Sequence, residues 1–280
     1  MGSILVTGGT GTLGTHVVRR LADQGNEPRL LSRRAAPAWP ERAMWFTGDL
    51  NTGKGLDRAL DGVTTVVHCA HSPASPSAEV TAMANLISAA ARAGVEHVVQ
   101  VSIVGMDHIP LPYYRGKVAA EELLGESGLD HTVLRATQFH ELLLWMFDRL
   151  TRLPVVPLPT GFWAQPIAAD EVAERLVAIA LEGPAPAPSD RDLGRDRARE
   201  QQIGGPQVRT VESLADAYFI AREIDPVLVR LPLPGRIASG FRSGANLTPK
   251  HREGVRTWEE FLEDRFREKE ANKPREWSLT

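Results

Sequence analysis

The stretch that decides the fold is Thr7-Gly8-Gly9-Thr10-Gly11-Thr12-Leu13-Gly14, between the strand-like run SILVT (3–7) and the helical segment LGTHVVRRLADQ (13–24). Gly8 permits a tight turn out of the strand, Gly11 lets the backbone approach a pyrophosphate, and Gly14 allows close packing of helix on strand. The helix start then offers unpaired N–H groups and a positive dipole end to phosphate. We therefore predict a dinucleotide-binding turn, with contacts from Thr7, Gly8, Gly11, Thr12, Leu13 and Gly14.

Apolar runs of strand length alternate with segments of helical period along the first half of the chain. Several runs are continuous and β-branched, which is typical of parallel strands buried on both faces. This alternation predicts an α/β fold with a Rossmann-type doubly wound parallel sheet. We expect strands at 3–7, 29–32, 44–47, 64–69, 97–102 and 131–135, and helices at 13–24, 78–93, 113–127 and 141–150.

The pattern changes after about residue 151, where proline-rich stretches appear. We expect helices at 170–181, 210–222 and 256–269, with Asp170 and Thr210 as the N-caps of the first two, and a short strand at 227–231. Residues 184–200 combine proline, alanine and charges, which predicts an exposed, mobile loop. Residues 1–153 are therefore expected to form the nucleotide-binding domain, and residues 154–280 to complete the sheet and form a small C-terminal substrate lobe.

The expected second strand ends in Ser32-Arg33-Arg34, where NAD-binding proteins usually place an acidic residue for the adenosine ribose. Guanidinium groups bind phosphate with paired hydrogen bonds, so this sequence favours the 2′-phosphate of NADPH over NADH. The alternative is a solvated basic turn. Further cofactor contacts are expected where two other strands end, at Asp49 and Leu50 near adenine and at Ala70, His71 and Ser72 near the ribose and pyrophosphate.

Composition excludes several classes of function. A formal net charge of -3 and a pI near 6.3 provide no global field for nucleic acid or anionic lipid. The single cysteine, Cys69, excludes an internal disulfide framework and lies in an apolar run, so an inert thiol is favoured over a reactive one. We expect a cytoplasmic protein without a signal peptide, membrane span or metal site, acting as a monomer or weak homodimer.

Together these residues resemble the short-chain dehydrogenase/reductase superfamily, and in particular its atypical, NmrA-like NAD(P)H-binding branch. The resemblance rests on the glycine pattern and on VVQVSIVGMDHIPLPYYRGKVAAEELL, LRATQFHELL, QPIAADEVA and TWEEFL, so it covers nearly the whole chain. It implies a seven-stranded, mostly parallel sheet and three catalytic residues: Tyr113 as proton donor, Lys117 to lower the pKa of the tyrosine and bind the nicotinamide ribose, and Ser102 to position a carbonyl oxygen. Tyr114 is an alternative to Tyr113, and Tyr113 as a packing residue is another.

The segment after the expected sixth strand is predicted to border the ligand crevice, because the carboxyl ends of parallel strands open onto it. We place Thr137 at the cofactor and Gln138, Phe139, His140 and Gln165 at the substrate; a histidine satisfied within the helix start is an equal alternative for His140. The resulting hypothesis is an NADPH-dependent reductase of a carbonyl or activated double bond in a small organic molecule. A non-catalytic NADP-binding redox sensor is the alternative, and a sugar-nucleotide epimerase-like enzyme is disfavoured by Arg33 and Arg34.

Overall fold

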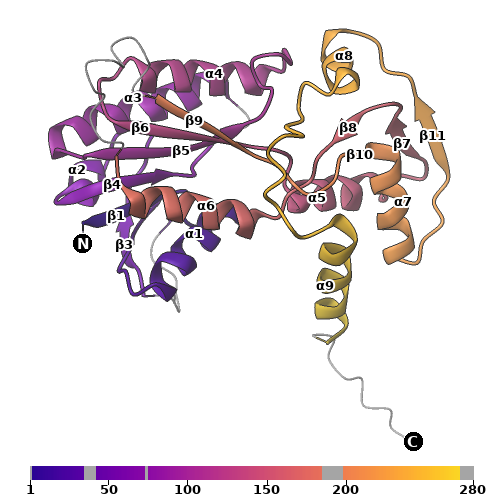
Figure 1. The fold of residues 1–280 in the computed structure, drawn as a ribbon, viewed down its shortest axis with the longest axis horizontal. Helices are drawn as coiled ribbons and strands as arrows, with labels where there is room; N and C mark the ends of the chain where they lie inside the picture. The colour runs from indigo at the N-terminus through magenta and orange to yellow at the C-terminus, as the bar shows by residue number, and fades with distance from the viewer. Residues whose placement is uncertain (1, 35–41, 73–74, 185–197, 272–280) are drawn as a thin grey trace, which may run out of the picture.

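The central feature of the computed structural model is a seven-stranded sheet with strand order β3-β2-β1-β4-β5-β6-β9, in which every pair of neighbours is parallel (Figure 1). The structure describes residues 2–34, 42–72, 75–184 and 198–271. The topology is that of a Rossmann-like α/β fold, which confirms the predicted fold class. The strands are β1 Ser3–Thr7, β2 Arg29–Ser32, β3 Met44–Thr47, β4 Val63–His68, β5 His97–Ile103, β6 His131–Ala136 and β9 Ala198–Ile203.

Helices cover both faces of this sheet, and each face has its own apolar core. One core joins β1 and β4 to α1 (Thr12–Asp23) and α6 (Ala169–Glu182). The other joins β1, β4 and β5 to α2 (Leu56–Leu60), α3 (Pro76–Ala93) and α4 (Pro112–Gly125). In Figure 1 the two helical layers lie above and below the strands. Both faces of the sheet are therefore buried, as the continuous apolar runs predicted.

A second lobe lies beside the sheet and has a separate core built around Phe147, Tyr218 and Trp258 (Figure 1). The Trp258 indole N–H donates to the carbonyl of Leu214 at 2.9 Å, which fixes the C-terminal helix on the lobe. Its elements are α5 His140–Leu150, β7 Val156–Pro159, β8 Trp163–Ala164, β10 Arg209–Thr210, α7 Val211–Ala221, β11 Leu228–Leu231, α8 Arg236–Ser243 and α9 Trp258–Ala271.

Three local predictions need correction. Helix α6 begins at Ala169 with Ala168 as its N-cap, so Asp170 lies in the first turn; the Glu171 carboxylate accepts the Ala168 N–H instead. The C-terminal helix begins at Trp258, two residues later than predicted. Of the loop predicted at 184–200, residues 185–197 lie outside the described residues, and residues 198–200 begin strand β9, which pairs with β6. Thr210 is the N-cap of α7 as predicted and accepts the Ser213 N–H.

Across the described ranges, none of the helices is both long and apolar enough to cross a membrane.

Candidate functional site

The glycine turn is packed so tightly that at two of its positions a β-carbon would collide with the backbone itself. Gly8 has φ +66°, and a β-carbon there would lie 2.6 Å from the amide nitrogen of Ala70, just beyond β4. A β-carbon on Gly14 would lie 2.2 Å from the carbonyl oxygen of Gly8, which also accepts the Gly11 N–H at 2.9 Å. The turn is therefore held against both the strand beside it and the helix it begins.

Gly11 differs from these two because it faces open space. It is exposed, and the nearest atom to a β-carbon there would be the Gly8 oxygen at 3.2 Å. Gly11 is the N-cap of α1 and no side chain caps this helix, so its first amide groups have no side-chain acceptor. Thr12 is exposed beside it, whereas Leu13 anchors the helix in the core. An uncapped helix start beside open backbone fits a pyrophosphate group.

The two arginines after β2 are exposed, while Ser32 before them is buried. The Ser32 hydroxyl accepts the Arg34 N–H at 3.2 Å, and the Arg34 carbonyl accepts the indole N–H of Trp45 at 3.1 Å. These bonds fix the backbone of the turn and leave both guanidinium groups in solvent. Arg33 and Arg34 can therefore meet a phosphate at this edge of the sheet, where the carboxyl end of β2 lies next to that of β1.

After β3, the predicted adenine contacts stabilise their own loop. The Asp49 carboxylate accepts the Asn51 N–H at 2.9 Å, and the Leu50 carbonyl accepts the side-chain amide of Asn85 at 2.7 Å. These bonds hold the β3–α2 connection against α3.

The ends of β1 and β4 are joined by a buried hydrogen bond between the Thr7 hydroxyl and Nδ1 of His68, at 2.8 Å. Burial, with the nearby Lys117 ammonium, lowers the pKa of His68 to about 4, so this imidazole is neutral at physiological pH. The next residue, Cys69, is also buried, and burial raises the pKa of its thiol to about 12. The expectation of an inert cysteine agrees with these surroundings.

At the centre of the site lies a buried ion pair that the sequence analysis missed. Nζ of Lys117 on α4 lies 2.6 Å from Oε1 of Glu79 on α3, and each side chain is 3% exposed. The other carboxylate oxygen of Glu79 accepts the Ser72 N–H at 2.6 Å. Burial alone would raise the pKa of Glu79, but Lys117 and the Ser72 amide outweigh it and hold this pKa below its ordinary value.

Close approach of α3 and α4 makes this pair possible. Gly116, beside Lys117, is buried, and a β-carbon there would lie 2.8 Å from the α-carbon of Pro76 at the start of α3. Helix α3 itself begins with a Ser75 N-cap, whose hydroxyl accepts the Ala78 N–H, followed by Pro76 at the first helical position. One turn later, Glu79 faces α4.

The predicted catalytic triad is only partly assembled. The Tyr113 ring is half-buried with its centroid 6.4 Å from that of His71, whereas Tyr114 is buried in an apolar cluster with Met106. Of the two tyrosines, Tyr113 is therefore the one near the end of β4, where the cofactor is expected to bind. The Ser102 hydroxyl is buried and donates to the sulfur of Met106 at 3.3 Å, so it does not join the tyrosine.

The electrostatics of Tyr113 also differ from the expectation. Burial, Glu79 and Tyr114 all raise the pKa of Tyr113. The expected lowering of this pKa by Lys117 is not seen in this structure, where the ammonium contacts Glu79. Burial and Lys117 lower the pKa of His71, so the phenol faces a neutral imidazole.

Two of the residues predicted to contact substrate, Gln138 and Gln165, belong to a hydrogen-bond network that joins separate segments of the chain. Gln165 is fully buried: its amide nitrogen donates to the carbonyls of Gly205 and Thr248, and its oxygen accepts the Thr248 N–H. Gln138 accepts the Gln165 N–H and donates to the carbonyl of Asn246. In this structure the side chains of Gln165 and Gln138 join these segments, and their substrate roles stay predictions.

The neighbouring predictions have similar outcomes. His140 is fully buried and packs against Trp258 and Phe261, with ring centroids 5.7 Å and 5.0 Å away. Burial lowers its pKa to about 4. The C-terminal helix covers it in this structure, and its role as a substrate contact stays a prediction. Phe139 pairs with Ile167 in an isolated bridge, and the buried Thr137 hydroxyl donates to the Gln165 carbonyl.

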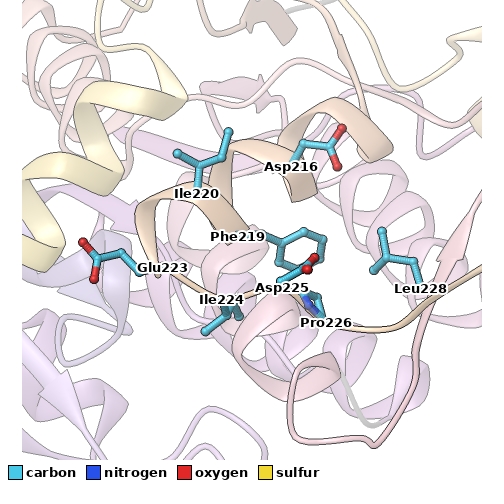
Figure 2. Close-up of a pocket in the computed structure, with 8 residues that line it drawn as sticks. All are labelled: Asp216, Phe219, Ile220, Glu223, Ile224, Asp225, Pro226 and Leu228. Carbon is cyan, nitrogen blue, oxygen red and sulfur yellow. The ribbon is translucent and has the colours of Figure 1, made fainter.

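Two hollows lie on the C-terminal lobe. One of about 500 Å³ is lined by α7 and the segment leading to β11, including Phe219, Ile220 and Leu228 (Figure 2). It has no residue of the glycine turn and is not the nucleotide site. The other, of about 370 Å³, lies between α8 and the β5–α4 connection and is lined by residues that include His108 and Arg236. This second hollow borders the connection that leads to Tyr113.

Comparison with known proteins supports a nucleotide site at this position. A family model described as NAD(P)H-binding matches residues 8–182. The photosystem II assembly factor Ycf39 of Cyanophora paradoxa is 33% identical over 156 residues, covering 52% of this chain and 48% of that protein. The ceramide reductase of Caulobacter vibrioides is 27% identical over 253 residues, covering 85% of this chain and 76% of that protein. The chain thus spans about half the length of the Ycf39 relative.

A solved structure of similar fold is the NADPH-dependent quinone oxidoreductase QOR2 of Escherichia coli in complex with NADPH. It superposes with a TM-score of 0.75 at 20% identity, covering 94% of this chain and 99% of that one. At this identity the likeness shows the fold alone. The family match, by contrast, begins in the glycine turn and extends through α6, over more than half of the sequence. The chain therefore belongs to the NAD(P)H-binding family.

Proposed function

We propose that this protein is an NADPH-dependent oxidoreductase that reduces a carbonyl group or an activated double bond of a small organic molecule. The observation that carries the proposal is the arrangement at the carboxyl end of the sheet. The open helix start at Gly11 and the buried Lys117 lie on either side of the joined ends of β1 and β4. Tyr113 stands one helical turn before Lys117, beside His71.

Each part of the site has a distinct task in this proposal. The amide groups at the start of α1 hold the pyrophosphate, and Arg33 and Arg34 bind the 2′-phosphate. Lys117 orients the nicotinamide ribose. When bound, the cofactor supplies hydride to the substrate. At neutral pH the Tyr113 phenol is protonated and can donate its proton to the reduced oxygen or carbon, and its raised pKa makes it a weaker acid than a free phenol.

Names of the relatives agree with a reductase but leave a second candidate. One relative is named a ceramide reductase, and another a photosystem II assembly factor. Two contacts favour a non-catalytic NADP-binding sensor: Lys117 is held by Glu79, and Ser102 is engaged by Met106. In that case the site would bind the cofactor, and no acid would be poised over a substrate.

Replacement of Tyr113 by phenylalanine separates the two candidates. We expect purified protein to oxidise NADPH with members of a panel of quinones, ketones and aldehydes. Tyr113→Phe should lower kcat by about 100-fold or more, the usual scale of general acid catalysis, and leave the dissociation constant for NADPH unchanged. Tyr114→Phe is the matched control and should retain turnover, because that ring is buried in the apolar cluster.

Unchanged turnover in Tyr113→Phe would refute the role of this phenol. Tight NADPH binding without turnover of any panel member would favour the sensor. If the protein bound neither pyridine nucleotide at millimolar concentration, the proposal would fail as a whole.

A further inference from the structure

We propose that Glu79 is a positioning residue of this site, which holds Lys117 and the connection after β4 in one geometry. The inference rests on the proposed function, because it assumes that Lys117 meets the cofactor. It assigns to Glu79 a role that the glycine turn and the Tyr-Lys pair do not imply.

The location of Glu79 is unusual for a carboxylate. It lies on the buried stripe of α3, in line with Met83 and Leu86, which are fully buried. A charged group on an apolar face is strongly destabilising unless it is paired and hydrogen-bonded. Glu79 meets both conditions: Oε1 contacts the Lys117 ammonium and Oε2 accepts the Ser72 N–H, each at 2.6 Å.

These two bonds connect three parts of the site. Ser72 belongs to the connection after β4, Glu79 to α3 and Lys117 to α4. An ammonium group has three N–H donors, and Glu79 engages one of them. Two donors remain, and the ion pair restricts the directions in which they point. A lysine without this partner would be a flexible chain ending in a buried, unpaired charge.

After burial, the pair also contributes to the pKa shifts of three titratable groups near it. The pKa values of His68 and His71, which follow the end of β4, are lowered by burial and by Lys117, and Glu79 opposes this effect. On α4, Glu79 raises the pKa of Tyr113. Because the two charges oppose each other at contact distance, the site presents a nearly neutral pair to the phenol and imidazoles.

The test compares Glu79→Gln, Lys117→Met and the double variant by fluorescence titration with NADPH. Glu79→Gln should weaken NADPH binding by at least about tenfold, the scale of one lost charged hydrogen bond. Lys117→Met should weaken it by a similar or greater factor, and the double variant should be no weaker than Lys117→Met alone. Glu122→Gln, an exposed glutamate on α4, is the matched control and should bind as wild type.

A second readout uses the protein without cofactor. The phenolate absorbance of each protein is titrated with base, and the titration of the same protein carrying Tyr113→Phe is subtracted. Glu79→Gln should move the onset of Tyr113 ionisation to lower pH, because a nearby negative charge has been removed. A carboxylate that only stabilises the fold would affect thermal unfolding but not NADPH affinity.

The inference is overturned if folded Glu79→Gln binds NADPH as tightly as wild type. It is equally overturned if the losses of the two single variants multiply in the double variant, since Glu79 would then not act through Lys117. Should Glu79→Gln fail to fold, a folded double variant that binds NADPH more weakly than Lys117→Met would overturn the inference, since Glu79 would then affect binding without the ammonium. If wild type binds no NADPH, the proposed function fails, and an unchanged Tyr113 onset would reject the inference independently.

Discussion

Substitution of Gly116 by alanine tests whether the close approach of α3 and α4 holds the site together. The new β-carbon would lie 2.8 Å from the α-carbon of Pro76, about 0.6 Å short of the 3.4 Å at which ordinary contact begins. Both atoms are backbone-anchored, so the helices must separate. Overpacking of this kind costs about 1–3 kcal/mol. Helix propensity returns up to about 1 kcal/mol, because alanine is favoured over glycine in a helix.

Gly125 in the same helix provides the matched control, because a β-carbon there would meet nothing within 4 Å. Gly125→Ala therefore carries the gain in propensity without the clash. In urea unfolding, we expect Gly116→Ala to be less stable than Gly125→Ala by about 1–3 kcal/mol. Gly116→Ala should also bind NADPH more weakly, since separating the helices stretches the ion pair between Lys117 and Glu79. Equal stability of the two variants, with equal NADPH affinity, would refute the reasoning.

Three further predictions concern the cofactor edge and two buried groups. Replacing Arg33 and Arg34 together by alanine should weaken NADPH binding about 10- to 100-fold in a fluorescence titration and leave NADH binding unchanged. Arg58→Ala, at an exposed arginine, is the control. Equal losses of affinity for both nucleotides would contradict the 2′-phosphate assignment. His140 has a folded pKa of about 4 against 6.5 for the free group, so the unfolded chain takes up a proton first as the pH falls. Stability should decline from pH 6.5 to about 4, by up to about 3 kcal/mol from this group. In urea unfolding, wild type should lose stability relative to His140→Leu as the pH falls over that range. A constant stability difference between the two proteins would show that the imidazole does not titrate as inferred. Cys69 should resist a thiol reagent at pH 8 in the native protein and react when unfolded, whereas fast native labelling would mean that the thiol is accessible.

Most of the sheet could be predicted because its strands carry their own signal. The runs that became β1, β2, β4, β5 and β6 are apolar, since both faces of each are covered. Strand β9 has the sequence AREQQI and no such pattern. It lies at the edge of the sheet and pairs only with β6, so its residues need not be apolar. Its place depends on a long-range pairing that local sequence does not encode.

The site, too, has parts that local sequence predicts and parts that depend on long-range packing. The glycine turn could be predicted because its function depends on residues that are neighbours in sequence. Glu79 could not be paired with Lys117 in advance, since the contact depends on the packing of α3 against α4. One signal was present: a lone carboxylate at helical spacing from Met83 and Leu86 requires a buried partner.

The surroundings of His140 and Gln165 could not be predicted from the local sequence. Their positions after strand β6 and before α6 are those at which ligands commonly bind in this fold. Here the segment around Thr248 and the aromatic side chains of α9 occupy that space. Local sequence could not foresee which part of the chain fills this space.

The route of the chain through β9 limits how this protein can be divided. After β6 the chain forms α5, β7 and β8 in the second lobe, returns to the sheet for α6 and β9, and then leaves again. A fragment ending at Glu182, where the family match stops, would leave the free edge of β6 with unsatisfied backbone groups, a template for aggregation. Grafting specificity from a relative would therefore require transplanting two separate segments around an unchanged β9, because no single cut separates the lobes.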